Sequence, residues 1–175
     1  MTKVKYGNIE TEVQWQWPTR AIFEDWKRDF FCLEEAKFFN VYLLGGFLEQ
    51  LDGKREYARD VDIILTGNEN KVQIEKLIYE GTRLGILKYN VFFDILWLDR
   101  LPDYSDKQKE KSQTVKMYLL SDKWIIDGIV RKQYDNAVQV SENLWQMETK
   151  FPTFKQKQLL ETGYVFSDPL LLSKE

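Results

Sequence analysis

The stretch LLGGFLEQLDGKREYARDVDIIL, residues 43–65, together with VFFDILWL, residues 91–98, decides the fold of this chain. The runs DVDIIL and VFFDILWL are apolar and rich in β-branched or aromatic residues, which predicts buried strands. Three aspartates interrupt these runs: Asp60, Asp62 and Asp94. An ionised carboxylate in an apolar strand is costly unless it is paired, hydrogen-bonded or bound to a cation. These three acids are therefore the first candidates for function.

Asp60 and Asp62 stand two positions apart in one predicted strand, so their side chains project from the same face. Two carboxylates that close repel each other, and a divalent cation is the simplest way to make the pair favourable. Asp94 supplies a third ligand if its strand lies beside the first. A single aspartate at a strand edge more commonly caps a turn or pairs with a basic residue such as Arg55 or Arg59. The three acids favour a metal site only when taken jointly with the glycine pair at residues 45–46.

Gly45 and Gly46 end one apolar run, residues 41–44, and open a short helical stretch that ends near Gly53. Such a turn exposes backbone N–H groups and lets a phosphate approach without side-chain obstruction, although glycine pairs also simply make tight turns. Gly46 stands fourteen positions before Asp60, with a short helix and a loop between them. The pattern predicts an anion cradle and a metal site at adjacent strand ends.

Lys54, Arg55 and Arg59 form a basic loop between the predicted cradle and the predicted metal strand. Contact with a triphosphate and plain exposure to solvent are both consistent with this loop.

Composition restricts the chemistry available to this chain. Its 175 residues include no histidine and one cysteine, Cys32. These counts exclude a Ser-His-Asp or Cys-His nucleophile pair, a histidine-rich zinc site, an internal disulfide and a cysteine-cluster metal site. Carboxylates remain as metal ligands, which favours Mg²⁺ or Mn²⁺. We expect Cys32 to be a small buried hydrophobe of an amphipathic helix.

Charge and hydropathy restrict the partners and the location. The net charge of −3 argues against a generic, strongly basic nucleic-acid coat. The first thirteen residues, MTKVKYGNIETEV, are polar, and no window approaches the roughly 18 apolar residues of a membrane span. We expect a soluble, cytoplasmic protein without a membrane partner.

The remaining pattern predicts an α/β fold. A small mixed sheet built from strands near 41–44, 60–66 and 90–98 is flanked by helices at 18–38 and 70–84, the second ending at Gly85. The segment VQWQW at 13–17 alternates like a short strand, and from about Ser112 onward the pattern is mainly helical. We therefore divide the chain into a core, residues 1–100 with its N-terminal helix, and a mainly helical C-terminal extension, residues 101–175.

Aromatic residues after the third strand have two possible roles. Tyr104, Tyr118 and Trp124 would stack on a nucleotide base or, more commonly, pack in the core or a lid. The stretch KFPTFKQK at 150–157 would contact an RNA backbone or, more commonly, act as a hinge with packed phenylalanines.

Residues 40–98 resemble the DNA polymerase beta-like nucleotidyltransferase superfamily. Its pattern begins with a hydrophobic residue followed by Gly-Gly or Gly-Ser. Some ten residues later comes the sequence Asp-hydrophobic-Asp-hydrophobic, and a third acid stands on a later strand. Here the matching segments are LLGGF, RDVDIIL and VFFDILWLD. The segment REYARD is similar to the basic turn of small bacterial and phage members, including the AbiEii-type toxins. Arg59 stands where the family usually has serine.

The resemblance implies a nucleotidyltransferase fold and a metal-dependent transfer of NMP from an NTP. Asp60 and Asp62 would hold two Mg²⁺ or Mn²⁺ ions, Asp94 would complete the catalytic metal site, and Gly45 and Gly46 would hold the β- and γ-phosphates. The acceptor would be a hydroxyl of RNA (tRNA, for example), a partner protein or a small molecule. Small members often act in toxin-antitoxin or phage-defence systems.

Two alternatives belong to other functional classes. A catalytically inactive relative would keep the fold as a binding or regulatory protein, although all three acids are present. A carboxylate-pair glycosidase is disfavoured, because Asp60 and Asp62 lie on one strand instead of flanking a bond from opposite sides at about 5–9.5 Å.

Overall fold

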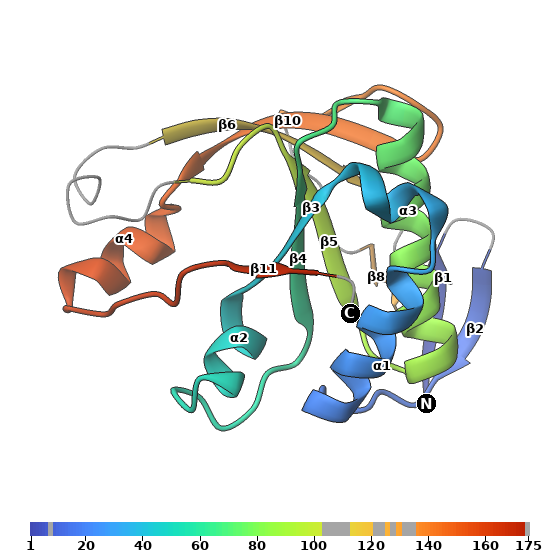
Figure 1. Cartoon of the computed structure of the whole chain (residues 1–175), viewed down its shortest axis with the longest axis horizontal. Coiled ribbons are helices and arrows are strands. Elements are labelled where there is room, and N and C mark those ends of the chain that lie inside the picture. Colours follow the sequence, from blue (N-terminus) through green and yellow to red (C-terminus); the bar gives the residue numbers. More distant parts are fainter. Residues whose placement is uncertain (7–8, 103–112, 121–124, 127–128, 131–135, 174–175) are drawn as a thin grey trace.

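The predicted strands form the centre of a seven-stranded mixed sheet in the computed structural model, which describes residues 1–6, 9–102, 113–120, 125–126, 129–130 and 136–173. Figure 1 shows α1 and α3 beside one face of this sheet. The strand order is β11-β3-β4-β5-β6-β10-β9; β4 and β5 are parallel, and every other neighbouring pair is antiparallel. The strands are β3 (Asn40–Leu44), β4 (Val61–Thr66), β5 (Phe93–Leu98), β6 (Gln113–Leu120), β9 (Val138–Gln139), β10 (Leu144–Phe151) and β11 (Leu170–Leu172).

A second, four-stranded sheet has the order β2-β1-β7-β8. Its strands are β1 (Thr2–Tyr6), β2 (Ile9–Val13), β7 (Ile125–Ile126) and β8 (Ile129–Val130). Buried Val4 and Val13 of this sheet pack with Ile86 from the region that follows α3.

Three of the described helices begin with a side-chain cap. The α-helices are α1 (Arg20–Phe30), α2 (Gly45–Leu51), α3 (Lys71–Leu84) and α4 (Phe154–Glu161), with a 3₁₀ helix η1 (Glu34–Phe38) and a π-helix η2 (Gly85–Tyr89). The side chains of Thr19, Asn70 and Thr153 accept backbone hydrogen bonds at the starts of α1, α3 and α4. In the part of the chain that the structure describes, no helix has the length and apolar character needed to cross a membrane.

Alternation along the central strands gives the sheet two different faces. One face packs on α1 and α3 (Figure 1), and its core residues include Val61, Ile63 and Leu65 of β4. The next residues along each strand point to the opposite face, where Ile64 and Leu98 join a second apolar cluster. Asp62 and Asp94 follow the same alternation, so they lie on the face that α1 and α3 do not cover.

The C-terminal part is mostly strands, and the expectation of a mainly helical C-terminal part is wrong. Among the described residues after 100, only α4 is helical. β6 and β10 pair over eight residues, from Leu144 opposite Leu120 to Phe151 opposite Gln113. The segment LWQMETKF contains many helix-forming residues, but pairing with β6 outweighs their propensity, because strand preference depends on packing against neighbouring strands.

Two local predictions also need correction. The helix predicted at 18–38 ends at Phe30 and is followed by η1, so Cys32 lies in the turn between them and is exposed rather than buried. The strand predicted at 13–17 ends at Val13, because residues 9–13 pair with β1 instead. The predicted α-helix at 70–84 does end at Leu84 with Gly85 as its cap, and the chain then continues through the π-helix η2 to Asn90, which has a φ of 55°.

Candidate metal centre and its surroundings

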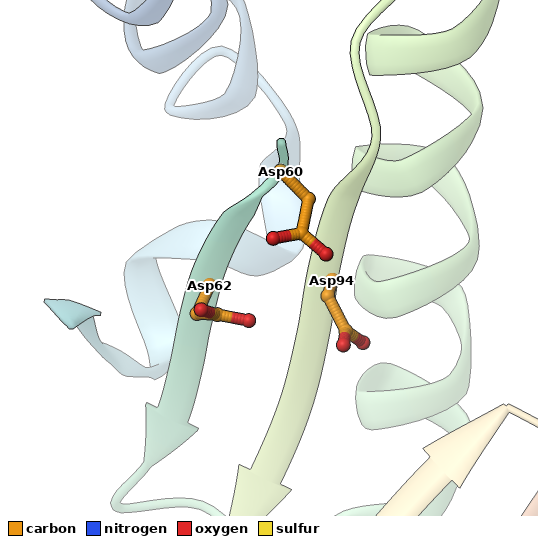
Figure 2. Close-up of side chains that lie close together, drawn as sticks. All are labelled: Asp60, Asp62 and Asp94. Atoms are coloured by element: carbon orange, nitrogen blue, oxygen red, sulfur yellow. The ribbon is translucent and has the colours of Figure 1, made fainter. Parts of the chain in front are cut away.

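The three predicted aspartates meet across two neighbouring parallel strands. Asp62 of β4 lies directly opposite Asp94 of β5, and Asp60 comes two residues before Asp62. Figure 2 shows the three carboxylates gathered over the two strands. One carboxylate oxygen from each residue lies within 4.8 Å of the other two, and all three side chains are half-buried. The predicted acid triad is therefore formed, and we use this name for Asp60, Asp62 and Asp94.

The donor set of the acid triad fits a hard divalent cation. Mg²⁺ binds oxygen ligands at about 2.1 Å in octahedral geometry, so neighbouring ligand oxygens lie about 3 Å apart and opposite ones about 4 Å apart. The triad oxygens, within 4.8 Å of one another, would need to move by about 1 Å to share one ion. Three half-buried carboxylates also carry enough negative charge to favour a divalent cation over a monovalent one.

Gly45 lies next to the acid triad, beside Asp62. Leu44, at the end of β3, pairs with Asp62, so the turn into α2 begins directly beside that carboxylate. Gly45 has a φ of +76°, and a Cβ there would lie 2.4 Å from Oδ2 of Asp62. Only glycine combines this backbone conformation with such a close approach. The glycine that the sequence predicted as a phosphate cradle also makes room for a metal-ligand candidate.

Gly46 makes room for a predicted phosphate-binding side chain. A Cβ at Gly46 would lie 2.7 Å from Nη1 of Arg55, so the guanidinium group lies on the glycine turn. Nε of Arg55 is 3.5 Å from Oε2 of Glu49, an α2 residue that is only 5% exposed. Because the Arg55 side chain itself is half-exposed, its guanidinium group has access to a ligand from solvent.

The other two predicted basic residues have different surroundings. The ammonium group of Lys54 donates a hydrogen bond to Oγ of Ser167, 3.0 Å away, near the C-terminal end of the chain. Arg59 is exposed and precedes Asp60 directly. The structure therefore brings Arg55 to the glycine turn, and a phosphate-binding role for Lys54, Arg55 and Arg59 stays a prediction.

Sequence reasoning missed Glu49 and Tyr164. The hydroxyl of Tyr164 donates to Oε1 of Glu49, so Glu49 links Tyr164 to Arg55. Burial, and then the neighbouring Glu49 carboxylate, raise the pKa of Tyr164 above its ordinary value. An acid inside the apolar run FLEQL was a sequence signal that Glu49 has a specific role. No sequence signal marked Tyr164, because its hydrogen bond to Glu49 joins residues 115 positions apart.

The aromatic predictions have mixed outcomes. Tyr118 is 2% exposed and packs on Trp97, with ring centroids 4.7 Å apart, so it belongs to the core. Tyr104 and Trp124 lie outside the described residues. The stretch 150–157 connects β10 to α4, and Phe154 is 78% exposed rather than packed.

Comparison with protein-family models found no family that matches the chain, and comparisons with curated proteins and with solved structures found no match. What the structure shares with the pattern described above is a mixed α/β fold, a parallel β4-β5 pair and the acid triad.

Proposed function

We propose that this chain is a metal-dependent nucleotidyltransferase, which moves an NMP from an NTP to a hydroxyl group. The observation that carries the proposal is the convergence of three carboxylate oxygens within 4.8 Å of one another, two of them on adjacent parallel strands and the third, from Asp60, directly before β4. The turn at Gly45, which lies beside the Asp62 carboxylate, and the motif resemblance of residues 40–98 support it.

Each residue of the site has a role in this proposal. Asp60 and Asp62 hold Mg²⁺ or Mn²⁺, and Asp94 completes the site and helps to activate the attacking hydroxyl. The bound cations supply charge neutralisation at the attacking and leaving oxygens. The backbone of Gly45 and Gly46 faces the β- and γ-phosphates.

The proposed reaction is an in-line displacement at the α-phosphorus. The acceptor oxygen forms a bond to the α-phosphorus, the bond to the bridging oxygen of the β-phosphate breaks, and pyrophosphate leaves. The hydroxyl proton passes to a carboxylate or to water. Chemistry of this kind depends on positioning and charge neutralisation, so a chain without histidine can carry it out.

The acceptor is the least constrained part of the proposal. A hydroxyl of RNA such as tRNA, of a partner protein or of a small molecule is compatible with the same site. Toxin-antitoxin and phage-related roles are proposed from the motif resemblance alone.

Binding and transfer are tested separately. Mg²⁺ together with an NTP should raise the melting temperature of the wild-type chain, because a ligand that binds only the folded state stabilises it. Asp62→Ala should abolish the gain, whereas Asp52→Ala, a change at an exposed aspartate outside the triad, should keep it. A gain of equal size in Asp62→Ala would contradict the metal site.

Transfer is tested by incubating the protein with Mg²⁺, total RNA or lysate, and an NTP labelled at either the α- or the γ-phosphate. The proposal predicts that the α-label, but not the γ-label, moves to an acceptor and that Asp62→Ala abolishes the transfer. Movement of the γ-label would indicate a kinase instead. A melting-temperature gain without any transfer would favour the non-catalytic, nucleotide-binding alternative.

A further inference from the structure

A pocket of about 250 Å³ adjoins the glycine turn that borders the acid triad. The core contributes Gly45, Gly46 and Arg55 to its lining. The other wall comes from residues 154–172, here called the C-terminal segment, which contributes Gln156, Tyr164 and Phe166. Figure 1 shows this segment running from α4 past α2 and back to the edge of the sheet as β11.

Specific contacts hold the C-terminal segment against the core. β11 pairs with β3 from Leu170 opposite Leu43 to Leu172 opposite Val41. The Tyr164 hydroxyl bonds to buried Glu49, and Lys54 bonds to Ser167. Because these contacts lie on both sides of Phe166 along the chain, the pocket has a fixed outer wall.

The lining of the pocket suits a flat, polar-edged ring attached to an anion. Tyr164 and Phe166 form an edge-to-face pair with ring centroids 4.9 Å apart, which gives the pocket an aromatic wall. Arg55 adds a half-exposed positive charge, and Gln156 adds a carboxamide. Pockets for whole drug-sized ligands hold about 300–1,000 Å³, so this one accommodates a single ring system while the rest of the ligand lies outside.

We propose that this pocket binds the base of the nucleoside triphosphate, while its phosphates extend along the glycine turn to the acid triad. This inference rests on the proposed nucleotidyltransferase function and adds the site of base recognition. Aromatic side chains and a carboxamide are groups that proteins use to stack on and hydrogen-bond a base. The C-terminal segment thereby becomes part of the substrate site.

The test compares two ligands of the full chain in the presence of Mg²⁺: a non-hydrolysable NTP analogue, taken with each of the four bases, and inorganic tripolyphosphate. Phe166→Ala should weaken binding of the best-bound NTP analogue about tenfold or more, because stacking on an aromatic ring contributes strongly to base binding. Its affinity for tripolyphosphate, which has no base, should stay unchanged. Phe154→Ala is the matched control, since Phe154 belongs to the same segment and is 78% exposed.

Two further variants keep the test decisive. Phe166→Leu preserves apolar volume if Phe166→Ala fails to fold, and it should show the same selective loss. Gln156→Glu keeps a side-chain oxygen that accepts from the Thr153 N–H in the capping box of α4, but it removes the amide donor. The ranking of the four bases should therefore change.

The outcomes separate the two proposals. Unchanged affinity for the NTP analogue in Phe166→Ala and Phe166→Leu would overturn the base pocket while leaving the metal site intact, provided that Asp62→Ala loses Mg²⁺-dependent binding. Equal weakening of analogue and tripolyphosphate would also overturn it, because the segment would then support phosphate binding only. If the wild-type chain binds neither ligand, both proposals fail.

Discussion

Gly45 is the residue at which backbone conformation and the chemistry of the candidate site are most closely linked. We predict that Gly45→Ala destabilises the fold, because a non-glycine residue at positive φ costs about 1–2 kcal/mol. The new Cβ, 2.4 Å from Oδ2 of Asp62, also forces that carboxylate to move. The variant should therefore lose the rise in melting temperature that Mg²⁺ and NTP give to the wild type.

Gly53→Ala is the matched control for this prediction. Gly53 has a φ of +75°, almost the same as Gly45, but no atom lies within 4 Å of the position that its Cβ would take. It should show the same backbone cost in urea unfolding and keep the response to Mg²⁺ and NTP. Loss of the response in both variants would show that strain in α2, and not contact with Asp62, is responsible.

Asp29 gives the stability of the protein a defined pH dependence. A hydrogen bond from Lys88, at 2.6 Å, and one from the Tyr89 hydroxyl lower the pKa of Asp29 below its ordinary value of 3.8. A carboxyl whose pKa is lower in the folded state stabilises the protein fully above its unfolded pKa. This stabilisation is lost as the pH falls below 3.8 through the lower, folded pKa.

Asp29→Asn tests that dependence. The difference in unfolding free energy between wild type and variant should be largest at neutral pH and should shrink as the pH falls below 3.8, measured by urea unfolding at several pH values. Tyr89→Phe removes one of the two hydrogen bonds and should give a smaller effect of the same sign. A difference that does not vary with pH would refute the assignment.

At the scale of elements, one side chain of α2 fixes the loop that leads into β4. The Gln50 carboxamide accepts a hydrogen bond from the backbone N–H of Ala58, at 2.8 Å, and donates one to the carbonyl oxygen of Pro18, at 3.2 Å. Ala58 is buried and comes two residues before Asp60. Gln50 therefore holds the start of β4, and with it the acid triad, against the core.

Gln50→Leu should lower stability by about 1–3 kcal/mol, because it leaves the buried N–H of Ala58 without its acceptor. It should also reduce the melting-temperature gain from Mg²⁺ and NTP. Gln50→Glu keeps the acceptor and should lose less of both. Thermal unfolding with and without ligand measures the two effects, and equal losses in the two variants would argue against the role of the Ala58 bond.

The elements differ in how far the sequence predicts them. β3, α2, β4 and α3 follow from short apolar runs and glycines, all of which act within a few residues. β6 and β10 do not, because their strand structure depends on pairing with each other and with β5 and β9, and no local pattern marks these partners. Tyr164 is a similar case at the site, since its role depends on a contact with Glu49, 115 positions away in the chain.

At the scale of the whole molecule, the seven-stranded sheet contains strands from both sides of residue 100. β6 pairs with β5, where Trp97 lies opposite Tyr118, and β11 pairs with β3. We predict that the fragment 1–100 does not unfold cooperatively, because it leaves both strand edges unpaired and uncovers buried Trp97 and Leu98. Chemical denaturation of the fragment and of the full chain measures this, and a cooperative transition in the fragment would support the division at residue 100.

The sequence by itself determined the chemical composition of the candidate centre: three aspartates at strand positions, a glycine pair before them, and no histidine or cysteine cluster to compete with them. These features are local, since each depends on residue type and spacing within one or two elements. Only the tertiary structure decided that Asp62 lies opposite Asp94 and that Gly45 borders the Asp62 carboxylate. It alone also decided that the C-terminal segment closes a pocket beside them. The physical reason is that strand pairing and buried contacts join residues far apart in the chain, and no local pattern encodes which partners meet.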